Sequence, residues 1–238
     1  MEDEDVVARG LVGLACALLL ALPATALAGA VTGTVRLEGA PPPPTKLPVT
    51  IDQYVCGREK EGEDLVLSPQ RGIRYAVVSL VDPPAAAAAL PTALDALPTP
   101  EMDQQACSFA PRVVLVPAGG TVRFLNSDRL LHNLHSAPGA SVEFNRTQPK
   151  GRTIPIVFPT PGIVRVSCDL HSWMRAWVVV AEHPFYAVTD AEGRFTLRGV
   201  PPGRYRLRVW QERLGTVTQD VVVRDGQDAA VVVGMTGK

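Results

Sequence analysis

The chain has 238 residues and a formal net charge of −1, so no basic excess marks it as a nucleic-acid-binding protein. Its 22 Pro and 20 Gly residues punctuate short valine-rich runs. This composition is typical of an all-β protein with many turns, and we find no amphipathic helix after residue 28.

The N-terminus has the pattern of an export signal. Residues 11–28 are nearly all apolar and end in Ala26-Leu-Ala28, a small-x-small cleavage site. We expect residues 1–28 to be a signal peptide cleaved after Ala28, and the protein to be secreted or periplasmic. The alternative is an uncleaved leader that anchors the chain, because 18 mostly apolar residues approach the length of a membrane span. No other membrane contact is expected.

Residues 29–82 are predicted to form an N-terminal β-rich segment. Val31–Leu37 alternates as a strand, and its Gly-x-Val pattern weakly suggests a second copy of the C-terminal fold described below. Tyr75–Val81 has the pattern of a buried strand. Residues 83–106 are rich in Ala and Pro, and prolines bracket their best helical stretch, so we predict a linker or surface insertion.

Residues 107–184 carry the candidate metal chemistry. The run Cys168-Asp-Leu-His171-Ser-Trp-Met174 sets a thiolate, an imidazole and a thioether at three-residue intervals. This donor set is typical of a blue-copper electron-transfer site, which needs a second histidine. His132 supplies one, after a predicted strand that runs into a polar turn, Val122–Asp128. Taken alone, the cysteine would more often be a core residue or half of a disulfide.

Residues 185–238 are predicted to form a small antiparallel β-sandwich. Ala187–Thr189, Arg194–Leu197 and Arg204–Trp210 alternate as strands, separated by turns at Asp190–Gly193 and Pro201–Gly203. These residues carry no catalytic constellation, so we interpret the region as a packing or docking domain.

Two family resemblances follow from these residues. Gly119–Asn126, His132–His135, Phe158–Gly162 and the Cys168–Met174 loop are together similar to the cupredoxins, the amicyanin- and plastocyanin-like blue copper proteins. Thr189–Val209 resembles the carboxypeptidase regulatory-like, transthyretin-type module, which is also classed with carbohydrate-binding-like folds. The resemblances imply an all-β protein with a cupredoxin-like Greek-key β-sandwich followed by the small sandwich.

The cupredoxin resemblance implies one copper ion in a type 1 site. It makes His132, Cys168 and His171 the equatorial ligands and Met174 the axial ligand. Asn133 is expected to tie the two ligand loops together from outside the coordination sphere.

The family also implies a docking surface. In cupredoxins the histidine of the C-terminal loop often reaches the surface through an apolar patch, which Leu134, Leu170 and Trp173 are candidates to furnish here. Trp173 is equally compatible with a core position. His135 lies on the opposite face of its strand from His132, so we interpret it as structural.

The cysteines allow one disulfide. Cys16 lies in the leader, and the resemblance assigns Cys168 to copper. Cys56 and Cys107 remain, and we predict that they pair in an oxidising compartment. The alternative is two unpaired buried thiols.

These features favour a one-electron carrier that cycles between Cu(I) and Cu(II) with a redox partner such as a cytochrome or a dehydrogenase. We do not expect an enzyme, because protein ligands fill the expected coordination sphere, whereas catalytic metals keep an open position. The alternatives are a copper carrier or sensor without a redox role, and a structural or carbohydrate-binding β-sandwich protein.

Overall fold

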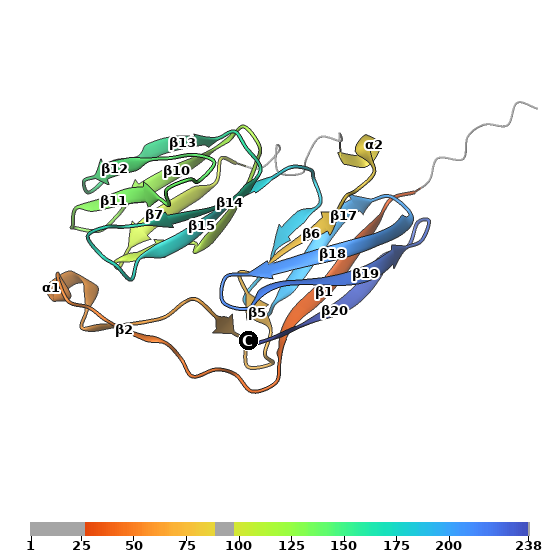
Figure 1. The fold of residues 1–238 in the computed structure, drawn as a ribbon, viewed down its shortest axis with the longest axis horizontal. Helices are drawn as coiled ribbons and strands as arrows, with labels where there is room; N and C mark the ends of the chain where they lie inside the picture. Colours follow the sequence, from red (N-terminus) through yellow and green to blue (C-terminus); the bar gives the residue numbers. More distant parts are fainter. Residues whose placement is uncertain (1–26, 89–97, 238) are drawn as a thin grey trace, which may run out of the picture.

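The computed structural model describes residues 27–88 and 98–237. These residues form 20 strands and two short helices, which confirms the predicted all-β fold class. The strands build two β-sandwiches that lie side by side (Figure 1). Residues 1–26 of the predicted signal peptide lie outside the described residues. No helix in the described part of the chain is long and apolar enough to cross a bilayer.

The first β-sandwich draws strands from both ends of the chain, and we call it the enclosing sandwich. Its sheets have the strand orders β17-β1-β20 and β16-β6-β18-β19. β1 runs antiparallel to β17 and parallel to β20, so it is the middle strand of its sheet. The strands are β1 (Gly29–Glu38), β6 (Val77–Val81), β16 (Tyr186–Val188), β17 (Arg194–Val200), β18 (Gly203–Gln211), β19 (Gly215–Val223) and β20 (Ala229–Thr236).

The position of β1 corrects two expectations. Val31, Val35 and Leu37 face the core of the enclosing sandwich and are at most 3% exposed. Burial of these apolar side chains stabilises the fold. The strands beside β1 that help to cover them are C-terminal ones, β17 and β20. Residues 29–38 therefore do not belong to a separate N-terminal segment. Nor is Val31–Leu37 a second copy of the C-terminal fold, because it is the central strand of that fold.

Residues 101–181 form the second β-sandwich, which we call the inserted sandwich because it lies between β6 and β16 in the sequence. Its sheets have the orders β13-β10-β7-β8 and β12-β11-β14-β15-β9. One hydrophobic cluster fills the space between them. The strands are β7 (Glu101–Gln105), β8 (Ser108–Ala110), β9 (Val113–Pro117), β10 (Gly120–Asn126), β11 (His132–Ser136), β12 (Asn145–Gln148), β13 (Ile154–Phe158), β14 (Gly162–Ser167) and β15 (Arg175–Ala181).

The linker before this sandwich is shorter than predicted. Glu101–Gln105 lies within the expected linker 83–106, yet it pairs with β10 as strand β7. A four-residue helix, α2 (Ala85–Ala88), begins the linker, and residues 89–97 lie outside the described part.

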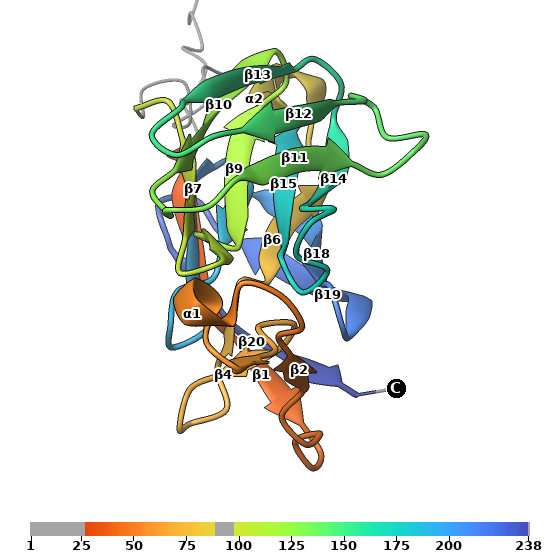
Figure 2. The ribbon, with the colours of Figure 1, turned by 90° about the vertical axis from the view of Figure 1, so that its left-hand side faces the viewer.

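Between β1 and β6 the chain makes an excursion to the end of the inserted sandwich (Figures 1 and 2). A disulfide between Cys56 and Cys107 joins the excursion to the β7–β8 hairpin. We call residues 49–57 the cap. The elements of the excursion are β2 (Lys46–Pro48), α1 (Gln53–Cys56), β3 (Glu59–Glu61), β4 (Val66–Leu67) and β5 (Ile73–Arg74).

A small hydrophobic cluster joins the sandwiches, in which Val77 of β6 packs with Val113 of β9 and Val179 of β15. Arg112 of the inserted sandwich forms a two-pronged ion pair with Glu212 of the enclosing sandwich, and both side chains are buried. The rings of Trp177 and Trp210 pack edge to face, with centroids 5.1 Å apart. The two sandwiches are therefore held together by apolar packing, an aromatic pair and a buried ion pair.

Candidate metal centre

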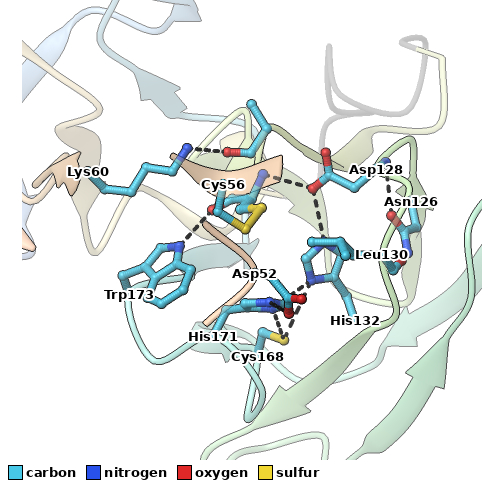
Figure 3. The surroundings of a disulfide bond; sticks show 12 residues. Asp52, Cys56, Lys60, Asn126, Asp128, Leu130, His132, Cys168, His171 and Trp173 are labelled. Atoms are coloured by element: carbon cyan, nitrogen blue, oxygen red, sulfur yellow. Dashed lines mark hydrogen bonds and ion pairs between the residues drawn. A yellow bond between two sulfur atoms is a disulfide. The ribbon is translucent and has the colours of Figure 1, made fainter. Parts of the chain in front are cut away.

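Three of the four predicted ligands converge at one end of the inserted sandwich (Figure 3). Nδ1 of His132 lies 3.0 Å from Nδ1 of His171. Sγ of Cys168 lies 3.6 Å from Nδ1 of His171 and 3.9 Å from Nδ1 of His132. Both histidines are fully buried and Cys168 is 3% exposed.

The loop that carries Cys168 and His171 is closed at its base. β14 and β15 pair antiparallel up to Ser167 and Arg175, so the loop spans the residues between them. Within it, the Met174 N–H donates to the carbonyl of His171 at 2.9 Å. The Met174 side chain is buried in the same core cluster as Cys168, on the loop that holds two donors.

A carboxylate contacts the far side of each imidazole. Nε2 of His132 lies 2.9 Å from Oδ2 of Asp128, and Nε2 of His171 lies 3.1 Å from Oδ2 of Asp52. A carboxylate accepts an N–H, so these contacts favour the tautomer with the proton on Nε2, which presents the Nδ1 lone pair to the other donors. Metal-binding histidines commonly have such carboxylate partners, which fix the tautomer and raise ligand basicity.

The donor set fits a metal ion. In this tautomer the two Nδ1 lone pairs face each other at 3.0 Å in a buried site, where they repel unless an ion or a proton lies between them. Metal–imidazole bonds are about 2.0–2.1 Å and metal–thiolate bonds about 2.3 Å, so donors up to about 4 Å apart can bind one ion. Burial lowers the pKa of His132 below its usual value, despite an opposing hydrogen bond to Asp128, which favours the neutral ring that binds metals.

Asn133 connects the two ligand-bearing segments. The N–H of Asp169, in the Cys168 loop, donates to Oδ1 of Asn133 at 2.7 Å. The Asn133 amide donates in return to the Asp169 carboxylate at 2.8 Å. His135 lies away from the three donors, where its ring hydrogen-bonds Asp169 and thereby lowers the pKa of that carboxyl.

The predicted Cys56–Cys107 disulfide is present in the structure, directly beside the metal centre. The Cys107 N–H donates to Oδ2 of Asp128 at 2.8 Å, the oxygen that also contacts His132. The Cys107 carbonyl accepts a hydrogen bond from the indole of Trp173 at 3.1 Å.

The predicted docking patch differs from the structure. Leu134 is fully buried in the core and cannot contribute to a surface. His171 does not reach the surface, because the cap carries Asp52 against its outer edge. Trp173 is partly buried against the core cluster, whereas Leu170 is 45% exposed.

Sequence reasoning missed both carboxylates. Asp128 had a weak signal, since it lies four residues before His132 in the polar turn. Asp52 lies 119 residues from His171, and no spacing rule connects them.

One family model matches part of the chain. Residues 172–236 match the family described as carboxypeptidase regulatory-like domain, which confirms that part of the prediction. No curated protein matches the chain.

The similar solved structures are cupredoxins. A purple cupredoxin from Nitrosopumilus maritimus is 23% identical, covering 34% of this chain and 99% of its own, with a TM-score of 0.31. A substituted amicyanin in a reduced Cu(I) form is 23% identical, covering 44% and 98%, with a TM-score of 0.34. The copper-containing nitrite reductase of Thermus scotoductus SA-01 is 24% identical, covering 42% and 27%, with a TM-score of 0.33.

Proposed function

We propose that this protein is a type 1 copper-binding protein that carries single electrons outside the cytoplasm. The convergence of two Nδ1 atoms and the Cys168 thiol in one buried pocket carries this proposal. Two imidazoles and a thiolate, with a thioether nearby, are the donors of blue-copper electron-transfer sites. Met174, on the same loop, is the axial ligand in this proposal.

Residues around the donors hold the donor side chains in fixed positions. When bound, copper supplies a one-electron couple between Cu(I) and Cu(II). Asp52 and Asp128 orient the two rings, and Asn133 fixes the Cys168 loop against β11. Donors held in this way keep their positions in both oxidation states, which reduces the rearrangement that accompanies electron transfer.

The burial of the donors supports an electron carrier over an enzyme or a delivery protein. A substrate or an acceptor of the ion needs access to the metal, whereas His132, Cys168 and His171 are at most 3% exposed. The disulfide supports an oxidising location, consistent with the expected export signal. The partner we propose is a redox protein such as a cytochrome or a dehydrogenase.

The test is the visible and EPR spectrum of the chain without residues 1–28, after addition of one equivalent of Cu(II). We expect an intense blue charge-transfer band and small copper hyperfine splitting, both lost in Cys168→Ser. Ser167→Ala is the matched control, because the Ser167 hydroxyl donates to the His135 carbonyl and not to the donor set. A weak spectrum that Cys168→Ser leaves unchanged would overturn the proposal.

Reversibility separates an electron carrier from a delivery protein. We expect the protein to keep its copper through repeated reduction and oxidation in the presence of a competing chelator. Stoichiometric release of Cu(I) on the first reduction would favour copper delivery instead.

A further inference from the structure

Asp52, at the start of α1, has an unusual backbone conformation, and its side chain does not cap the helix. It precedes α1 (Gln53–Cys56) with a left-handed φ of 51°, which is uncommon for a residue other than glycine. An aspartate in this position commonly accepts a hydrogen bond from the first helical N–H groups. The Asp52 side chain makes no such bond, and its carboxylate contacts His171.

The cap is packed onto the inserted sandwich. Val49 and Cys56 are buried in the core cluster that also contains Cys168. The Gln53 side chain donates to the Val49 carbonyl at 2.7 Å and closes the loop on itself. The disulfide with Cys107 fixes the end of α1. The cap therefore holds Asp52 in place against the ligand loop.

We propose that the cap is a built-in cover of the metal centre, in which Asp52 is the positioning residue for His171 and the disulfide is the anchor. By accepting a hydrogen bond from Nε2–H, Asp52 turns Nδ1 of His171 towards Cys168, as Asp128 does for His132. The cap also closes the outer edge of His171 to solvent. The role towards copper rests on the proposed function, whereas the covering of His171 does not.

The two histidines depend on the anchor differently. Asp52 belongs to the cap, four residues before Cys56, so its position depends on the cap staying attached. Asp128 instead accepts a hydrogen bond from the backbone of Cys107, which belongs to the β7–β8 hairpin. Loss of the disulfide should therefore expose His171 and leave His132 covered.

The covering is tested in metal-free protein by carbethoxylation of histidines with diethyl pyrocarbonate, read by peptide mass. His135, whose side chain is 33% exposed, is the internal reference for a reactive ring. In the disulfide-free double variant Cys56→Ser with Cys107→Ser, we expect the rate at His171 to rise about 30-fold or more. This fold-change corresponds to about 2 kcal/mol, the lower end of the usual contribution of a disulfide.

The pattern of modification decides the outcome. A rise at His171 with His132 unchanged supports the cap. No rise at His171, or equally fast modification in the intact protein, overturns it. If the carbethoxylation rates of His132 and His183 rise as well, the protein has unfolded generally. This result too would overturn the proposal, in which the disulfide anchors the cap alone.

The positioning role is tested by the tautomer of His171 in metal-free protein, from ¹⁵N NMR at about pH 8, above the usual pKa range of histidines. We expect the Nε2–H tautomer in the wild type, a mixture of tautomers in Asp52→Ala, and recovery in Asp52→Asn, whose amide oxygen still accepts. Glu59→Gln is the matched control, because it removes a carboxylate from the same excursion at its ion pair with Lys46. An unchanged tautomer in Asp52→Ala would overturn the role.

Copper affinity adds an independent readout. We expect Asp52→Ala to weaken Cu(I) binding by about 10- to 100-fold in competition with a chromophoric chelator, with Glu59→Gln unchanged. A wild type that binds no copper would refute the proposed function, while the carbethoxylation and NMR results would still decide whether the cap covers and orients His171.

Discussion

The enclosing and inserted sandwiches share a layered architecture but differ in what lies at their ends. The enclosing sandwich has an apolar core, and the polar side chains of Ser79, Thr189 and Gln211, which it also buries, are uncharged. The core of the inserted sandwich continues into Cys168 and Met174 and ends in buried polar groups, among them His132 and His171. Among the described residues, both groups of side chains able to hold a metal lie in the inserted sandwich.

This difference shows that a β-sandwich supplies a rigid frame and that its connections supply the chemistry. The donors come from the start of β11 and from the loop between β14 and β15. Their partners come from a polar turn and from the cap. The cap lies in the connection between β1 and β6, so a connection of the enclosing sandwich also contributes to the site. Each prediction below disturbs one side of this comparison.

The largest expected effect is on the enclosing sandwich alone. Val35→Asp places an unpaired carboxylate in a fully buried position of β1, which we expect to cost more than about 5 kcal/mol and to unfold this sandwich. Arg36→Asp places the same group on the exposed side of β1 and should have little effect. Limited proteolysis with mass spectrometry should yield a resistant fragment around residues 98–184 only for Val35→Asp; complete digestion would show that the two sandwiches unfold together.

The next largest effect concerns the contact between the sandwiches. Glu212→Leu removes the two-pronged partner of the buried Arg112 guanidinium and leaves only its 3.8 Å contact with the more exposed Glu63, at an expected cost of about 3–5 kcal/mol in denaturant unfolding. The double variant Arg112→Met with Glu212→Leu removes both charges and should recover most of that stability. Equal destabilisation in the single and double variants would mean that the pair itself, rather than the stranded charge, sets the cost.

A smaller effect is expected at the metal end of the inserted sandwich. Asn133→Ala removes the hydrogen bonds that join β11 to the Cys168 loop, at an expected cost of about 1–3 kcal/mol. Asn145→Ala, which removes an exposed partner of the same Asp169 carboxylate, should cost less. The measurement is urea unfolding of metal-free protein, and equal costs would argue against Asn133 as the tie between the ligand segments.

The smallest effect is a pH dependence at the joint between the sandwiches. His183 donates from Nε2 to the Leu80 carbonyl and accepts at Nδ1 from the Phe185 N–H, so it is neutral. Burial lowers its pKa below the usual 6.5. The unfolded chain then binds more protons below about pH 6.5, so stability falls as pH decreases from that value towards the folded-state pKa.

His183→Gln should reduce this loss of stability between about pH 7 and pH 5, since glutamine keeps a donor for Leu80 and does not titrate in this range. The measurement is the difference in thermal midpoint between the two pH values. A variant with the same pH dependence as the wild type would assign the effect to another group.

Sequence patterns predicted those parts of the structure that are encoded locally. Strand alternation predicted the β fold, and three-residue spacing placed Cys168, His171 and Met174 on one loop. The disulfide was open to prediction because few cysteines remained to pair. Contacts between residues far apart in the sequence could not be predicted. No local pattern indicates that β1 lies between β17 and β20, or that Asp52 contacts His171, because each contact depends on the assembled sheets.

The central place of β1 has a consequence for the order of folding. β1 precedes every other described strand in the sequence and β20 follows them all, yet Val31 pairs with Ala229. As the chain is synthesised, the edge of β1 that pairs with β20 therefore stays open until the last strand is made, a state that favours aggregation. Folding of the inserted sandwich in the meantime brings the distant ends together and lowers the entropy cost of closing the sheet. Early folding of the inserted sandwich would therefore favour closure of the sandwich that surrounds it in the sequence.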